Sequence, residues 1–245
     1  MVATRNDKNS LPYIIINMAM SADGKIATAD RAIHSFGSSR DLDNLYRLRA
    51  QADAVMCGAR TAEIDSITLG TGGEKYKRMR IKNKLAPHHI RIIVSGSGSI
   101  NTNAEVFKSK ISPIILITKK SIEDEILNKL RNVSDDFILF GDKEIDFKKA
   151  LAFLKEKWNV NVLICEGGGE LNSSLLKLGL VNEIYVTICP YIFGGEKAPT
   201  IADGDGITLL KNAVNLKLIS GKLIESEIFL HYRVEKKILI LKEVL

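Results

Sequence analysis

The residues best suited to do chemistry lie around three consecutive glycines late in the chain. An apolar, β-branched run, residues 160–165, leads to Glu166 and then to Gly167, Gly168 and Gly169. Leucines at helical spacing follow, so the pattern predicts a strand, a glycine turn and a helix. Glycine lets the backbone approach a ligand closely, and the first N–H groups of a helix point outward without partners. The turn therefore fits either a seat for an anionic group or a plain glycine-rich connection, and the local sequence favours neither.

A second polar cluster follows the first apolar run of the chain, residues 12–20. Ser21, Asp23 and Lys25 place a hydroxyl, a carboxylate and an ammonium group at the predicted end of a buried strand. Asp23 is followed by glycine, which is turn chemistry. Taken alone, this pattern favours an ordinary turn over a catalytic cluster.

The elements that must position these clusters alternate between strand and helix until two consecutive strands appear near the end of the chain. This order predicts an α/β fold with a mostly parallel central sheet, an antiparallel C-terminal edge and flanking helices. A parallel sheet gathers its strand ends on one edge, where ligands bind. Five polar clusters fall at predicted strand ends: residues 21–25, 58–61, 95–99, 118–120 and 166–169.

Bulk properties indicate an ordinary globular protein. The chain has 245 residues, 26% charged residues and a formal charge of +6. No apolar run approaches the roughly 18–20 residues of a membrane span, and the polar start lacks an apolar signal region, so we expect a cytoplasmic protein. Without a linker or repeat, residues 12–245 are expected to form one domain after a flexible tail, residues 1–11.

Cysteine and histidine usage argues against a metal site. Cys57, Cys165 and Cys189 each lie in an apolar run, which is typical of buried, reduced thiols. The four histidines have no metal-ligand spacing. We therefore expect no bound metal.

The most basic stretch is residues 70–89, which carries six lysines and arginines between residues 75 and 84 and shows no apolar stripe. A solvated basic loop explains it more simply than a phosphate site. Its charge also raises the alternative of a nucleic-acid-binding protein, but only 6% of the residues are aromatic and Tyr76 alone lies among the basic ones. We expect no nucleic-acid partner and no membrane partner.

Six motifs occur in a fixed order over nearly the whole chain, and together they resemble the pyrimidine reductase of riboflavin biosynthesis. This family includes the C-terminal domain of the bacterial deaminase–reductase and its free-standing archaeal and fungal counterparts. The motifs are residues 17–27 (NMAMSADGKIA), 48–54 (LRAQADA), 58–65 (GARTAEID), 166–171 (EGGGEL), 179–184 (GLVNEI) and 190–195 (PYIFGG). A dinucleotide fingerprint of the Rossmann type is not met, because the glycines lack the required spacing.

The resemblance implies a dihydrofolate-reductase-like fold, NADPH as cofactor and usually a homodimer. It also implies the reaction, which is hydride delivery to C1′ of a phosphorylated ribosylaminopyrimidine to give the ribitylaminopyrimidine. The zinc deaminase signature is absent, so the chain is expected to be a reductase only. Two substrates stay open: the 2,5-diaminopyrimidinone phosphate and the 5-aminouracil phosphate.

The resemblance also assigns roles to matching positions. The catalytic candidates are Lys25, by preference, and Asp23. Charge and strand-end position add Lys119 or Lys120 for a 2′-phosphate. The cofactor-binding candidates are Thr61, Asp65, Ser95, Gly96, Gly167, Gly168, Gly169, Glu170 and Leu171; the substrate-binding candidates are Ser21, Arg40 and Glu166.

One departure from the family pattern bears on the substrate. Where the family has Asp-Pro-x-Leu-Thr-x-Arg, this chain reads SITLGT over residues 66–71, so the proline and a substrate-side arginine are missing. Arg40, Arg60 or the basic segment are candidates for the lost phosphate contact. The missing arginine leaves open a similar reductase of another substrate, and an inactive dinucleotide-binding module is a third possibility.

Overall fold

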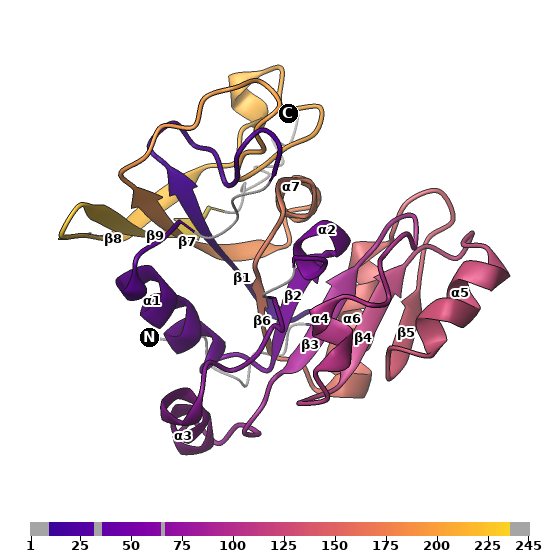
Figure 1. Cartoon of the computed structure of the whole chain (residues 1–245). Helices are drawn as coiled ribbons and strands as arrows, with labels where there is room; N and C mark the ends of the chain where they lie inside the picture. The colour runs from indigo at the N-terminus through magenta and orange to yellow at the C-terminus, as the bar shows by residue number, and fades with distance from the viewer. Residues whose placement is uncertain (1–9, 32–35, 65–66, 236–245) are drawn as a thin grey trace, which may run out of the picture.

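The computed structural model describes residues 10–31, 36–64 and 67–235, and one nine-stranded sheet runs through it (Figure 1). Asp65 and the final segment, residues 236–245, lie outside the described residues, as does most of the predicted tail. The strands are β1 (Tyr13–Ser21), β2 (Ala54–Gly58), β3 (Ile90–Val94), β4 (Ile114–Thr118), β5 (Asp136–Leu139), β6 (Val162–Cys165), β7 (Val181–Cys189), β8 (Leu216–Ile224) and β9 (Glu227–Val234).

The strand order is β5-β4-β3-β2-β6-β1-β7-β9-β8. The seven strands from β5 to β7 are parallel to one another. Strand β9 pairs antiparallel with both β7 and β8. The predicted α/β architecture, mostly parallel with an antiparallel C-terminal edge, is confirmed.

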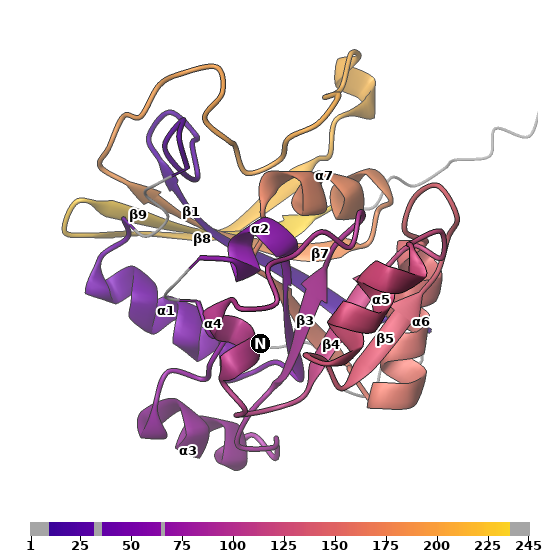
Figure 2. The same cartoon turned by 45° about the vertical axis from the view of Figure 1, so that its right-hand side comes forward.

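Helices cover both faces of the parallel part of the sheet (Figures 1 and 2). One core cluster lies under α6 and α7, and the other lies under α1, α2, α4 and α5. None of the helices in the described ranges is both long enough and apolar enough to cross a membrane. The helices are α1 (Ser39–Arg49), α2 (Ala59–Ala62), α3 (Glu74–Lys82), α4 (Glu105–Lys108), α5 (Asp124–Arg131), α6 (Phe147–Trp158), α7 (Gly169–Lys177) and the 3₁₀ turn η1 (Leu210–Asn212).

The lengths of the central strands create the opening in which the site lies. Strand β6 pairs with β1 only as far as the pair Ile16 and Cys165, and then the chain turns away. Strand β1 continues beside β7 to the pair Ser21 and Cys189. Residues 17–21 of β1 therefore have a strand neighbour on one side only, and the glycine turn departs beside them.

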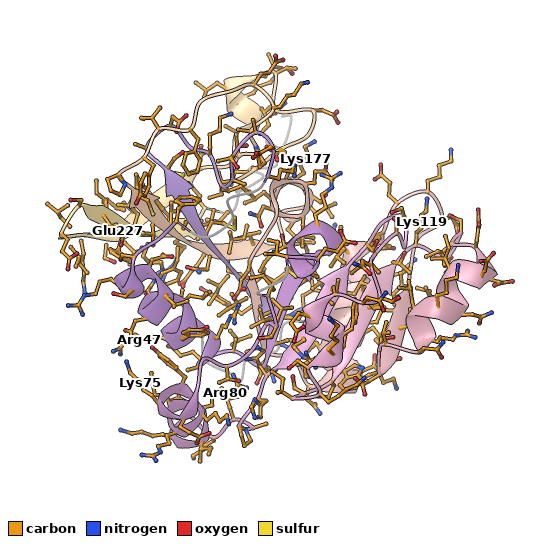
Figure 3. All side chains as sticks on the ribbon, viewed as in Figure 1. Arg47, Lys75, Arg80, Lys119, Lys177 and Glu227 are labelled. Carbon is orange, nitrogen blue, oxygen red and sulfur yellow. The ribbon has the colours of Figure 1, made fainter. Side chains whose placement is uncertain are left out.

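Helix α1 begins after a serine N-cap. The Ser38 hydroxyl accepts hydrogen bonds from the backbone N–H groups of Arg40 and Asp41, which is N-cap geometry. Both oxygens of the buried Glu227 carboxylate accept from Ser38, one from its backbone N–H at 2.7 Å and one from its hydroxyl at 2.5 Å. The start of α1 is thereby fixed to β9, as the position of Glu227 in Figure 3 illustrates.

The basic segment is not the loop that its composition predicts, because residues 74–82 form helix α3. Tyr76 and Arg80, one helical turn apart, are both buried. The Arg80 guanidinium donates to the carbonyls of Arg49, Ala52 and Ala86 at 2.6–2.8 Å and so joins α3 to the end of α1 (Figure 3). The inward stripe of α3 consists of a tyrosine and an arginine, which a hydropathy pattern does not reveal.

Replacing Arg80 by methionine should destabilise the protein, because the three carbonyls would lose their donor while staying buried. We expect the free energy of unfolding to fall by about 3 kcal/mol. Urea denaturation measures it. Arg78→Met is the matched control, since Arg78 lies exposed on the same helix and its loss should cost less than about 0.5 kcal/mol. Equal effects of the two substitutions would contradict this role for Arg80.

Candidate functional site

The three glycines of the turn after β6 are required for different reasons. Gly167 has φ +81°, and a Cβ there would lie 2.8 Å from the Met18 sulfur. A Cβ on Gly169 would lie 2.4 Å from the carbonyl oxygen of Thr200. A Cβ on Gly168 would meet nothing nearer than the Thr61 hydroxyl, at 4.0 Å. Packing thus explains Gly167 and Gly169, whereas Gly168 alone faces open space.

Gly168 is also the N-cap residue of α7, and no side chain caps this helix. The first N–H groups of an uncapped helix, together with the helix dipole, favour an anionic ligand. Helix α2 lies beside α7 at the carboxyl ends of β2 and β6 (Figures 1 and 2), and Gly58 donates its N–H to the carbonyl of Gly167 at 2.8 Å. Thr61 and Gly168, predicted to bind one ligand, therefore do lie together.

Ser21, Asp23 and Lys25 form a closed turn against the loop that follows β7. The Asp23 carboxylate accepts from the Ser21 hydroxyl at 2.6 Å and from the backbone N–H groups of Phe193 and Gly194. The Ser21 hydroxyl and these N–H donors lower the pKa of Asp23 to about 2. Asp23 is therefore ionised at neutral pH and braces the turn, which does not suit a proton donor.

The Lys25 ammonium donates to the carbonyl of Ala198 at 3.0 Å, and the Lys25 backbone bridges Thr200. Thr200 in turn lies against Gly169. The segment that contains Thr200 thus lies between Lys25 and the start of α7. Lys25 remains the candidate for proton transfer because its ammonium group is held in place by a neutral carbonyl group.

Glu166 does not project freely toward a substrate. Its two carboxylate oxygens accept from the Nε and Nη2 atoms of Arg49, each at 2.6 Å, in a bidentate ion pair. The third guanidinium nitrogen, Nη1, donates to the carbonyl of Gly70 at 2.5 Å. Arg49 belongs to one of the six motifs, yet residue type and spacing alone did not mark it as a site residue.

Asn17 is a second residue that the sequence did not mark. Asn17 and Glu166 continue the alternation of Ile15 and Ile164, so both point to the α1 side of the sheet. The Asn17 side chain is buried, and its Oδ1 oxygen has no hydrogen-bond partner in the described part of the chain. A buried acceptor at the edge where β6 turns away is a signal only a structure reveals.

The remaining candidates spread along the same edge of the sheet. Gly96 is exposed, and a Cβ there would meet nothing within 4 Å. Ser95, just before it, is buried. Lys119 follows β4 on this edge (Figure 3), behind Thr118, whose buried hydroxyl oxygen has no partner within the described ranges.

Three of the predicted site residues do not direct their side chains into the opening. Glu170 is exposed and pairs with Arg60 at 3.4 Å. The Leu171 side chain belongs to the core, so only its backbone can face a ligand. Arg40 is exposed on the first turn of α1. Nowhere in the described chain do three or more His, Cys, Asp or Glu side chains group as a metal site would need.

This is a parallel α/β protein with a glycine turn and an uncapped helix at the carboxyl edge of a central strand, a site suited to a phosphorylated ligand. The chain belongs to the RibD C-terminal domain family, whose model matches residues 12–230.

Relatives in this family are named as reductases. The 2,5-diamino-6-ribosylamino-4(3H)-pyrimidinone 5′-phosphate reductase of Archaeoglobus fulgidus is 30% identical over 194 residues, 79% of this chain and 87% of that protein. The enzyme of the same name from Aquifex aeolicus is 29% identical over 231 residues, which cover 93% of this chain and 98% of that one.

Solved structures share the fold. A pyrimidine reductase-like protein from Corynebacterium diphtheriae aligns with a TM-score of 0.77 and 22% identity, over 92% of this chain and 93% of that one. The RibD protein of Acinetobacter baumannii aligns with a TM-score of 0.75 and 19% identity. This chain spans 93% of its own length in that alignment but only 59% of the Acinetobacter chain.

The different roles of the glycines predict different costs of adding a methyl group. Gly169→Ala should lower the free energy of unfolding by about 2 kcal/mol, because the new Cβ overlaps the Thr200 carbonyl and Asp203. Gly168→Ala should change it by less than about 0.5 kcal/mol, since the space is open. Thermal and urea unfolding measure both. The reverse order of stabilities would show that the open space is assigned to the wrong glycine.

Proposed function

We propose that this protein is an NADPH-dependent reductase of riboflavin biosynthesis. Its substrate is the 2,5-diaminopyrimidinone phosphate, and it reduces the ribosylamino C1′ to give the ribitylamino compound. The single observation that carries the proposal is Gly168, open to the Thr61 hydroxyl at the uncapped start of α7. Family membership and the names of the relatives support it.

In this proposal NADPH lies along the carboxyl edge of the sheet. The backbone of Gly168 to Leu171 would hold the pyrophosphate and the nicotinamide half, with Thr61 facing it. The exposed Gly96 leaves room for the adenosine end, and Lys119, beyond it on the same edge, offers a cation for the 2′-phosphate of NADPH. These positions follow one another along β6, β2, β3 and β4, which are neighbours in the sheet.

Bound NADPH would supply the hydride, so the protein itself needs to bind and orient the substrate and to transfer one proton. When the ring oxygen gains a proton, its bond to C1′ breaks and leaves a protonated imine at C1′, which the hydride would reduce to the ribitylamine. Lys25 is our candidate for that proton transfer, since the ammonium is held at the edge of the site by the Ala198 carbonyl. Asp23 positions the turn that carries Lys25 rather than donating a proton.

Asn17 is our reason for proposing the diamino substrate rather than the uracil. Its buried Oδ1 can only accept a hydrogen bond, and a pyrimidine 2-amino group is a donor whereas a 2-oxo group is not. Leaving such an acceptor without a donor costs about 1–3 kcal/mol, which is enough to discriminate between the two pyrimidines.

The proposal is tested by NADPH oxidation with both riboflavin intermediates, together with NADPH binding to a Gly168→Asp variant. Negative charge and bulk at Gly168 should weaken NADPH binding by at least about 100-fold, because the carboxylate would meet the pyrophosphate. Far-UV circular dichroism checks that the variant stays folded. No turnover of either pyrimidine by the wild type would refute the riboflavin assignment, and unchanged NADPH affinity would refute the cofactor site.

Asn17→Leu keeps the side-chain size but removes the acceptor. We expect kcat/KM for the diaminopyrimidinone to fall by roughly 10- to 100-fold, with a smaller change for the aminouracil. Steady-state kinetics with each substrate measure the ratio. An equal fall for both pyrimidines would mean that Asn17 does not read the 2-position.

We also propose that the protein is a homodimer that pairs through the C-terminal edge of the sheet. Strand β8 is the edge strand, and its first eight residues are exposed on both faces. Leu216, Leu218, Ile219 and Leu223 expose 42, 54, 41 and 73% of their surface, and Ile228 of β9 exposes 40%. An apolar edge of this kind is normally covered, and a second copy supplies a surface of matching character.

Leu218→Glu should therefore shift the protein from dimer to monomer in analytical ultracentrifugation, because it places a charge in an apolar contact. Ile81→Glu is the matched control, since Ile81 is similarly exposed, at 57%, but lies on α3, directly before β3, which is in the other half of the sheet from β8. The control should not change the mass. A wild-type protein that sediments as a monomer would overturn the proposed interface.

A further inference from the structure

Arg49 occupies a position between two parts of the site that are far apart in sequence. Two of its nitrogens hold Glu166, directly before the glycine turn, and the third holds the Gly70 carbonyl. Arg49 is only 5% exposed. Its guanidinium carbon lies over the Tyr46 ring, 5.5 Å from the ring centroid. A single buried side chain thus contacts the turn after β6 and the segment of residues 68–71.

That segment is held in an unusual way, by buried side chains acting on three consecutive carbonyl groups. Arg91 donates to Thr68 at 3.4 Å, His89 donates through Nε2 to Leu69 at 2.7 Å, and Arg49 donates to Gly70. Burial and nearby arginines hold the pKa of His89 well below its usual range, so the ring is neutral and its N–H serves as a donor.

The backbone of the segment needs this support. Leu69 adopts φ +52°, a left-handed conformation that is unfavourable for leucine, and its side chain is 2% exposed. Gly72 lies beneath the Tyr46 ring, and a Cβ there would lie 2.3 Å from a ring carbon. The Tyr46 ring in turn packs at a tilt against the Tyr76 ring of α3, with the centroids 5.1 Å apart. The segment is therefore fixed from the core side by Arg91 and His89, and it is tied to the glycine turn by Arg49.

We infer that Arg49 is a positioning residue that fixes the glycine turn, residues 166–169, relative to residues 68–71. This inference rests on the proposed function, in which the turn holds the cofactor. Both carboxylate oxygens of Glu166 accept hydrogen bonds from Arg49, so Glu166 acts by positioning the turn and not by donating a proton. Arg49 acts on the reaction only through these two segments.

Lysine at position 49 separates positioning from charge. Arg49→Lys keeps the positive charge, but a single ammonium cannot hold both Glu166 oxygens and the Gly70 carbonyl. We expect NADPH to bind about tenfold more weakly and kcat per folded molecule to fall by about 10- to 100-fold. Amide hydrogen exchange should rise by about tenfold in residues 67–73 and in residues 166–171 together.

The matched control is Arg47→Lys, which changes an exposed arginine of the same helix that pairs with Asp43. It should leave NADPH affinity, kcat and exchange in both segments unchanged. A merely structural role for Arg49 would lower the melting temperature but leave NADPH affinity and kcat per folded molecule at the values of the control. That result would overturn the inference.

Glu166→Gln provides a second variant in case Arg49→Lys does not fold. Its amide keeps the shape but loses the charge, while Arg49 can still donate to Gly70. Exchange should then rise in residues 166–171 and stay low in residues 67–73, and equal rises in both would contradict the bridge. If the wild type binds no NADPH, the proposed function fails, but the exchange patterns of the variants still decide whether Arg49 joins the two segments.

Discussion

The arrangement of the site depends on one constraint, the insertion of the late strand β6 between the early strands β1 and β2. This insertion brings Glu166 and the glycine turn beside strand ends that come from the first quarter of the chain. Because β6 has only four residues, it turns away while β1 continues, and the opening forms there. A polar edge that looks scattered in sequence is thereby concentrated along four adjacent strands.

Buried arginines also stabilise the structure. Arg49, Arg80 and Arg91 are all buried, and most of their hydrogen bonds go to backbone carbonyls, several of which lie in segments without regular structure. Each carbonyl so bonded avoids the cost of burial without a partner. Burial lowers the pKa of Arg91 to about 10, yet that value still leaves the side chain charged at neutral pH. Arginines here take the place that apolar side chains and regular structure occupy elsewhere.

The sequence predicted the architecture well because strand and helix periodicity is local. Apolar runs predicted β1 and β6. Helix α3 was not predicted, because its buried stripe contains Arg80 in place of apolar residues. The site was predictable as a set of strand ends, and Thr61 and Gly168 do meet, but the pairing of Arg49 with Glu166 and the orphan oxygen of Asn17 depend on cross-strand register. Such register is not encoded in the spacing of any single motif.

The same insertion has a consequence for how the chain is made. Strands β2, β3, β4 and β5 are consecutive and can pair as soon as they emerge from the ribosome. Strand β1 pairs only with β6 and β7 in the described sheet, and these begin at Val162 and Val181, so one of the most apolar stretches of the chain is translated long before its partners. Long-range parallel pairing of this kind is slow. Strand β1 is therefore translated early relative to its partners and is among the last strands of this sheet to be paired.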